Sequence, residues 1–210
     1  ADQLVSIKSK LPETVTLVAV SKTKPNTDIL EAYSIGHRVF GENKVQELVK
    51  KQEKLPKDIQ WHMIGNLQRN KVKFIAPFVA LIHGVDNLKL LQEIDKRAVQ
   101  NNRKIDCLLQ VYIAKEDTKF GFEINEVKEV LLATSSFKNI SIVGLMGMAT
   151  FTDDNNQIKE EFKSLKTVFD SIKNDTITIL SIGMSGDYPL AIEQGSTMVR
   201  VGSAIFGLRN

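Results

Sequence analysis

Short β-rich apolar runs alternate with helix-like segments from one end of the 210-residue chain to the other. This alternation limits the possible folds more than any other feature of the sequence. Strands that are separated by helices, without hairpin signals between them, typically lie parallel in an α/β fold. The eight predicted strands are 15–20, 38–40, 60–64, 79–82, 105–112, 140–145, 177–181 and 198–201.

The segments between the predicted strands show the periodicity of amphipathic helices. Apolar residues recur three and four positions apart in 88–98 and 158–169, which is the spacing of one helix face. Asn26 or Thr27 is predicted to cap one helix, and Asp86 or Asn87 to cap another. The pattern therefore predicts helical crossovers between successive parallel strands.

Eight strand–helix units favour a closed barrel over an open sheet. They take about 26 residues each, close to the (β/α)₈ TIM barrel, which typically has roughly 250 residues. An open doubly wound sheet is the alternative, but it usually has a glycine-rich first turn, and segment 21–25 contains no glycine. With no linker or low-complexity tract, residues 1–210 are predicted to form a single-domain α/β TIM barrel.

Composition excludes several classes of protein. A single cysteine rules out an internal disulfide framework and a Cys-rich zinc site, and the three scattered histidines suggest no metal centre. The 28 basic and 25 acidic residues are interspersed, as in 47–54, so no nucleic-acid partner is expected. The apolar run 75–82 is too short to cross a membrane, and no secretory leader precedes the first strand. We expect a cytoplasmic monomer with a small-molecule site.

The loops after the last two predicted strands suggest an anion site. Functional groups of a barrel gather at the carboxyl ends of its strands, and the loops after strands 7 and 8 often bind phosphate. Segments 183–187 and 202–203 are rich in glycine and serine, so their backbone N–H groups can approach an anion closely. The alternative is that these residues only form turns.

Lys22 is the candidate nucleophile. Period-2 alternation places it on the same face as Val18 and Val20, at the mouth of the predicted barrel. Apolar neighbours and the nearby Lys24 would favour its neutral amine, the form that attacks an aldehyde to give a Schiff base. The alternative is a solvated lysine beyond a strand end.

Arg200 lies between two valines in the last predicted strand, an unusual place for a permanent cation. A buried charge must be paired or must face a ligand. Because arginine stays protonated, it can donate hydrogen bonds there but cannot accept them. A salt bridge to a neighbouring strand and a ligand contact are both possible explanations.

Several long motifs are spread over nearly the whole chain: Ala19–Pro25 (AVSKTKP), Phe40–Asn43 with Val45–Glu47, Trp61–Lys71, Lys119–Phe122, Gly144–Met148 and Ser181–Gly207. In sequence and in order, these motifs resemble those of the YggS/PROSC family of pyridoxal-phosphate homeostasis proteins.

The resemblance implies a barrel similar to the N-terminal domain of bacterial alanine racemases, with pyridoxal 5′-phosphate (PLP) held as a Schiff base on Lys22. It also implies that Arg200 faces the pyridine nitrogen, where a cation leaves the ring a weaker electron sink than a carboxylate would. The other residues that it places at the cofactor are Asn43 and His62 near the ring, and Ser185, Gly202 and Ser203 around the phosphate.

By the same resemblance, the chain is expected to serve intracellular PLP homeostasis, without a dedicated second substrate and without catalytic residues. It would hold PLP and could deliver it to PLP-dependent apo-enzymes. Racemisation is not expected, because 210 residues leave no room for the second domain that supplies a catalytic tyrosine in the racemases. The alternatives are a Schiff-base barrel enzyme of aldolase or racemase type, and a regulatory module that binds other proteins.

Overall fold

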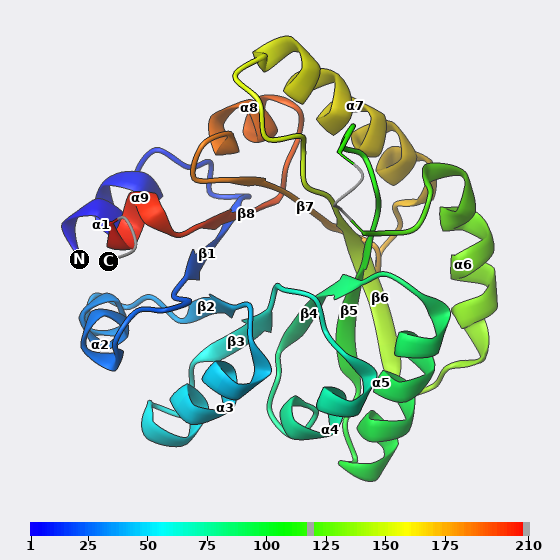
Figure 1. Ribbon diagram of the computed structural model, residues 1–210, viewed down its shortest axis with the longest axis horizontal. Helices are drawn as coiled ribbons and strands as arrows, with labels where there is room; N and C mark the ends of the chain where they lie inside the picture. The colour runs from blue at the N-terminus through cyan, green and yellow to red at the C-terminus, as the bar shows by residue number, and fades with distance from the viewer. Residues whose placement is uncertain (117–119, 208–210) are drawn as a thin grey trace.

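The computed structural model describes residues 1–116 and 120–207, and it is a closed barrel of eight parallel strands (Figure 1). Each strand pairs with the next along the chain, and β1 closes the barrel against β8, with Val18 opposite Arg200. The predicted single-domain TIM barrel is confirmed. The strands are β1 (Thr16–Val20), β2 (Val39–Glu42), β3 (Gln60–Met63), β4 (Leu81–Val85), β5 (Ile105–Gln110), β6 (Ile140–Met146), β7 (Ile179–Met184) and β8 (Met198–Val201).

Helices surround the barrel and cover its outer face (Figure 1). The first helix, α1, packs beside the last, α9. Among the described residues, no helix combines the length and the apolar character needed to span a bilayer. The α-helices are α1 (Asp2–Lys8), α2 (Asn26–Ser34), α3 (Val45–Lys54), α4 (Val72–Ile75), α5 (Leu88–Gln100), α6 (Val127–Ala133), α7 (Asn155–Ile172), α8 (Tyr188–Glu193) and α9 (Ser203–Phe206).

Alternate residues of each strand serve two separate apolar clusters. Ala19 and Phe40 face outward into the large cluster that the strands form with the helices. Val18, Leu108 and Met198 belong to a smaller cluster that fills the barrel interior. This two-sided burial explains why the strands are mostly apolar, as expected for parallel sheets.

Element boundaries differ from the sequence expectation at several places. β4 starts later than predicted and runs to Val85, β2 extends to Glu42, and β7 extends to Met184. Asn87 caps α5 as predicted, accepting a hydrogen bond from Leu90 N at 2.9 Å. The predicted cap of α2 is wrong, because Asn26 is already helical and follows the extended Pro25.

Candidate functional site

A cavity of about 580 Å³ opens at the carboxyl ends of the strands, a volume that suits a small ligand. Its walls come from the ends of β1, β2, β3, β7 and β8 and from the loop after β6. Six of the seven predicted site residues line it together: Lys22, Asn43, Ser185, Arg200, Gly202 and Ser203. His62 is not among the residues that line this cavity.

Lys22 stands two residues beyond the end of β1, half-buried in the cavity wall. Val20 and Ile64 provide apolar surface in the same cavity. Lys24 also lines it. The alternation along β1 therefore brings an amine to the mouth of the barrel, beside both apolar and cationic neighbours.

The loops after β7 and β8 are joined to each other in the cavity wall, next to the end of β1. Ser185 Oγ accepts a hydrogen bond from Gly202 N at 3.0 Å, and the serine hydroxyl keeps its own proton for another acceptor. Gly183 has a φ of +97°, and a Cβ atom there would lie 2.6 Å from the Cβ of Ala191. Glycine is therefore required where the chain turns from β7 into this wall.

Arg200 is buried in the barrel, with 4% of its surface exposed. Its Nη1 donates to the carbonyl and hydroxyl oxygens of Ser181, at 2.8 and 2.6 Å, and its Nη2 donates to Gly147 O at 3.0 Å. Within the described residues no carboxylate forms a salt bridge with it. Burial lowers the pKa of Arg200 to about 10, which leaves the guanidinium charged at neutral pH.

A chain of polar side chains continues from Arg200 through the barrel interior. Ser181 Oγ lies 3.2 Å from His83 Nδ1, and His83 Nε2 lies 3.0 Å from His62 Nδ1. Because arginine only donates, we assign the serine proton to His83 and the His83 Nε2 proton to His62. Burial lowers the pKa of His62 to about 3 and that of His83 well below its ordinary value, so both rings are neutral.

The sequence showed the three histidines as scattered, yet the fold brings two of them into contact. His62 and His83 are both buried, on adjacent strands β3 and β4. Across the described residues, no group of three His, Cys, Asp or Glu side chains could hold a metal ion. Hydrogen bonds through His83 and Ser181 link His62 to Arg200 in the cavity wall.

The cavity suits a ligand with an anionic end and an electrophilic end. Lys22, Lys24 and Arg200 line it against two carboxylates, Asp153 and Asp187, so the charges of these side chains sum to +1. The cationic excess and the serine hydroxyls match a phosphate, and the amine of Lys22 matches an aldehyde. The residues present therefore fit PLP.

Sequence reasoning missed a second polar cluster, on the outer side of β2. Glu42 and Lys51 are buried there, with Glu47 beside them. The sequence showed 47–54 only as a stretch of interspersed basic and acidic residues. One signal was available: Lys51 continues the three-residue spacing of Val45 and Leu48, which places it on the buried face of α3.

Comparison with known proteins places the chain in a family. Residues 1–210 match the family described as "Alanine racemase, N-terminal domain". A "Pyridoxal phosphate homeostasis protein" of Aquifex aeolicus is 41% identical, with the match covering 92% of this chain and 86% of the relative. The protein of that name in Escherichia coli is 37% identical, over 95% of this chain and 88% of the relative.

Solved structures show the same relationship. PipY of Synechococcus elongatus, solved without PLP, has a TM-score of 0.93 and 35% identity, with 98% of this chain and 99% of that chain covered. PipY with PLP bound has a TM-score of 0.90 and 36% identity, with the same coverage. An alanine racemase of Clostridium difficile shares the fold, with a TM-score of 0.78 at 15% identity, over 99% of this chain and 56% of that one. This chain belongs to the alanine racemase N-terminal domain family and, within it, to the pyridoxal phosphate homeostasis proteins.

Proposed function

We propose that this protein binds PLP in the cavity at the barrel mouth, covalently on Lys22, and serves intracellular PLP homeostasis. The observation that carries the proposal is the meeting of Lys22, Arg200 and the loops after β7 and β8 around one cavity. PipY, 36% identical over 98% of this chain, has been solved with PLP bound. Relatives at about 40% identity carry the name of homeostasis proteins.

Lys22 supplies the covalent link. Its neutral amine attacks the aldehyde carbon, and a C=N bond forms as one water molecule leaves. The apolar Val20 and Ile64 lie in the same cavity wall as this amine. Asn43, at the end of β2, lines the cavity and offers both a donor and an acceptor to the ring.

The phosphate end is assigned to Ser185, Gly202 and Ser203 in the loops after β7 and β8. Arg200 is assigned to the pyridine nitrogen, to which a protonated guanidinium can only donate. Ring protonation is then disfavoured, and a cofactor that otherwise serves as an electron sink is weakened in that role. We assign His62 to the support of Arg200 through His83 and Ser181.

The same assignment implies a carrier rather than an enzyme. We propose that the protein has no dedicated second substrate, acts as a cytoplasmic monomer, and can deliver PLP to apo-enzymes that require it. No residue is assigned a catalytic role. Delivery would need only reversal of the bond to Lys22 by water, which returns the amine and the aldehyde.

The test is borohydride reduction of the PLP-loaded protein, followed by peptide mass mapping. We expect a violet-absorbing chromophore and a pyridoxyl group on Lys22 after reduction. The Lys22→Gln variant should lose the covalent adduct, while Lys24→Gln, a neighbouring lysine in the same cavity, should keep it. A protein that stays colourless and unmodified with PLP would overturn the proposal.

Trapping a phosphorylated sugar on Lys22 in place of PLP would instead support an aldolase-type enzyme. Racemisation or transamination of amino acids at enzyme-like rates would contradict the carrier function. Both measurements use the purified full chain, and each would redirect the assignment of the cavity to a different reaction.

A further inference from the structure

We propose that Glu47 and Lys51, one turn apart on α3, are positioning residues that hold the two peptide groups flanking Lys22 and so aim its amine into the cavity. This inference rests on the proposed covalent role of Lys22. Neither Glu47 nor Lys51 is among the residues that line the cavity. Both act from outside the barrel, through the backbone of the loop after β1.

The contacts lie on either side of the Lys22 Cα atom. Lys51 Nζ donates to the carbonyl oxygen of Ser21 at 2.7 Å, which belongs to the peptide group before Lys22. Thr23 N, in the peptide group after Lys22, donates to Glu47 Oε1 at 2.6 Å. Two rigid peptide planes are therefore fixed from one turn of one helix, and they set the direction of the Lys22 Cα–Cβ bond.

The loop conformation needs such a restraint. Thr23 has a φ of +66°, a region that a β-branched residue rarely adopts. The hydrogen bond to Glu47 falls on the N–H of this residue. Strained backbone conformations persist only where their surroundings over-determine them, and they concentrate at functional sites. The strain thus lies one residue from the amine that it would orient.

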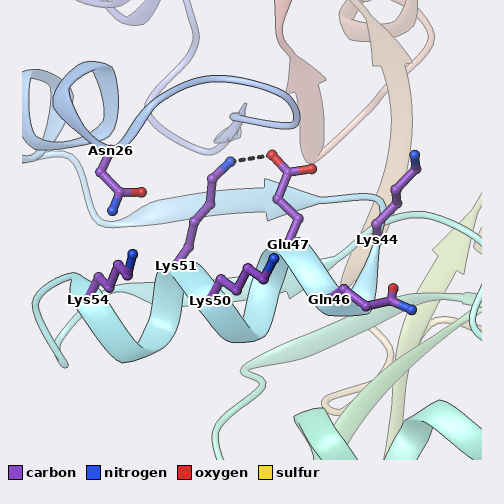
Figure 2. A pocket seen from close by; sticks show the side chains of 7 residues that line it. All are labelled: Asn26, Lys44, Gln46, Glu47, Lys50, Lys51 and Lys54. Carbon is purple, nitrogen blue, oxygen red and sulfur yellow. Dashed lines mark hydrogen bonds and ion pairs between the residues drawn. The ribbon is translucent and has the colours of Figure 1, made fainter.

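Lys51 is itself held in place by two carboxylates. Its Nζ lies 2.7 Å from Glu42 Oε1 and 2.7 Å from Glu47 Oε1, and Glu42 Oε1 also accepts from Ser21 Oγ at 2.5 Å. Figure 2 shows Lys51 and Glu47 directed toward one another from α3. Glu42 is fully buried, and its Oε2 has no hydrogen-bond partner among the described residues.

A surface role does not account for this arrangement. The neighbouring Lys50 and Lys54 are exposed and line the outer groove between α2 and α3, of about 360 Å³ (Figure 2). Lys51 also borders that groove, yet its ammonium group donates to Ser21, Glu42 and Glu47. Lys51 is buried and donates to a backbone carbonyl, so its role is to hold the loop after β1.

The experiment compares Glu47→Ala with Glu47→Gln. The glutamine retains an oxygen that can accept from Thr23 N, whereas the alanine does not. The first readout is the rate of chromophore formation after mixing the apo-protein with PLP. We expect Glu47→Ala to slow this rate about tenfold or more, because small misplacement of a reacting group has large effects, and Glu47→Gln to recover most of it.

Two further readouts separate positioning from general damage. The second readout is the Kd for pyridoxine 5′-phosphate, which has no aldehyde. Because the phosphate end of the cavity stays intact in Glu47→Ala, we expect this Kd to change by less than about twofold. Hydrogen exchange of the Thr23 amide in the apo-protein should accelerate in Glu47→Ala and stay slow in Glu47→Gln. Lys50→Met, one position from Lys51, is the matched control and should behave as wild type.

The outcomes distinguish this inference from the proposed function. If the wild type never traps PLP on Lys22, the proposed function fails. If the wild type traps PLP and Glu47→Ala does so at the same rate, only the positioning role is overturned. Equal loss in Glu47→Ala and Glu47→Gln, or a parallel loss of pyridoxine 5′-phosphate binding, would also overturn it. Lys51→Met provides a second variant, expected to slow capture as Glu47→Ala does.

Discussion

Two buried polar networks flank the cavity, one inside the barrel and one outside it. The inner network runs from Arg200 through Ser181 and His83 to His62, and its only charge is the guanidinium. The outer network joins Glu42, Glu47 and Lys51 between β2 and α3, and it consists of charges. The inner network holds the guanidinium of Arg200, and the outer network bonds the backbone on either side of Lys22.

The difference shows two ways in which a protein interior can supply partners for a buried polar or charged group. Neutral histidines let the inner network transmit hydrogen bonds without adding charge next to Arg200, which forms no salt bridge within the described residues. The outer network lies behind the loop and can therefore pair a lysine with two carboxylates. Buried ion pairs depend on both partners, since removal of one leaves a desolvated charge.

The largest effect is expected when the outer network loses its cation. Lys51→Met should lower the free energy of unfolding by about 3–5 kcal/mol, because Glu42 then keeps a buried charge without a counterion. Burial already raises the pKa of Glu42, and the variant should raise it further. Because a raised pKa means that the folded state binds this proton more tightly than the unfolded chain does, the destabilisation should grow as pH rises. Urea unfolding at several pH values can measure this trend.

The double variant Glu42→Gln with Lys51→Met removes the orphaned charge and should recover part of that loss. Lys50→Met, an exposed neighbour, should change the free energy of unfolding by no more than about 0.5 kcal/mol. Equal effects of Lys50→Met and Lys51→Met would show that the outer network does not contribute as a buried ionic unit.

The inner network should instead make the fold sensitive to acid. His62 has a folded pKa of about 3 against an ordinary value of 6.5, so the unfolded chain binds protons first as pH falls. Stability should then decline below pH 6.5, by up to about 1.4 kcal/mol per pH unit for each of His62 and His83. The measurement is the urea midpoint between pH 7 and pH 5.

Replacing both rings, as His62→Gln with His83→Gln, should flatten this dependence. A residual slope is expected from His37, the third histidine, because burial lowers its pKa as well. An unchanged slope in the double variant would mean that the neutral His62–His83 pair is not the source of acid sensitivity.

A smaller effect is expected at the link between His83 and Arg200. Ser181→Ala removes one acceptor of Arg200 Nη1 and the partner of His83 Nδ1, at a cost of about 1–2 kcal/mol in the free energy of unfolding. Ser196→Ala is the matched control, since its buried hydroxyl contacts backbone carbonyls only. Only Ser181→Ala should also weaken PLP binding, as measured by spectroscopic titration.

The fold and much of the candidate site could be predicted from local sequence patterns. The strand–helix alternation predicted a barrel, and the position of Lys22 two residues after Val20 predicted an amine at its mouth. Glycines and serines after the last two strands predicted an anion site, and these loops line the same cavity. These features are local, because period-2 alternation and turn chemistry are properties of a few adjacent residues.

The partners of the site residues could not be predicted in this way. Ser181 and His83 are 98 residues apart in sequence, and Lys51 reaches Ser21 across 30 residues. Lys51 lies in a stretch of mixed charge, and Glu42 lies beyond the predicted strand 38–40 yet forms the buried end of β2. Which polar group a buried side chain meets depends on the register of distant strands.

The sequence by itself determined the element order, the two-sided burial of the strands and the placement of Lys22, Arg200 and the glycine-rich loops at one end of the barrel. Closure of the barrel decided the rest. It brought His62 and His83 into hydrogen-bond distance and set α3 behind the loop that carries Lys22. The physical reason is that hydrophobic periodicity is encoded residue by residue, whereas a buried polar group acquires its partner only when separate elements pack together.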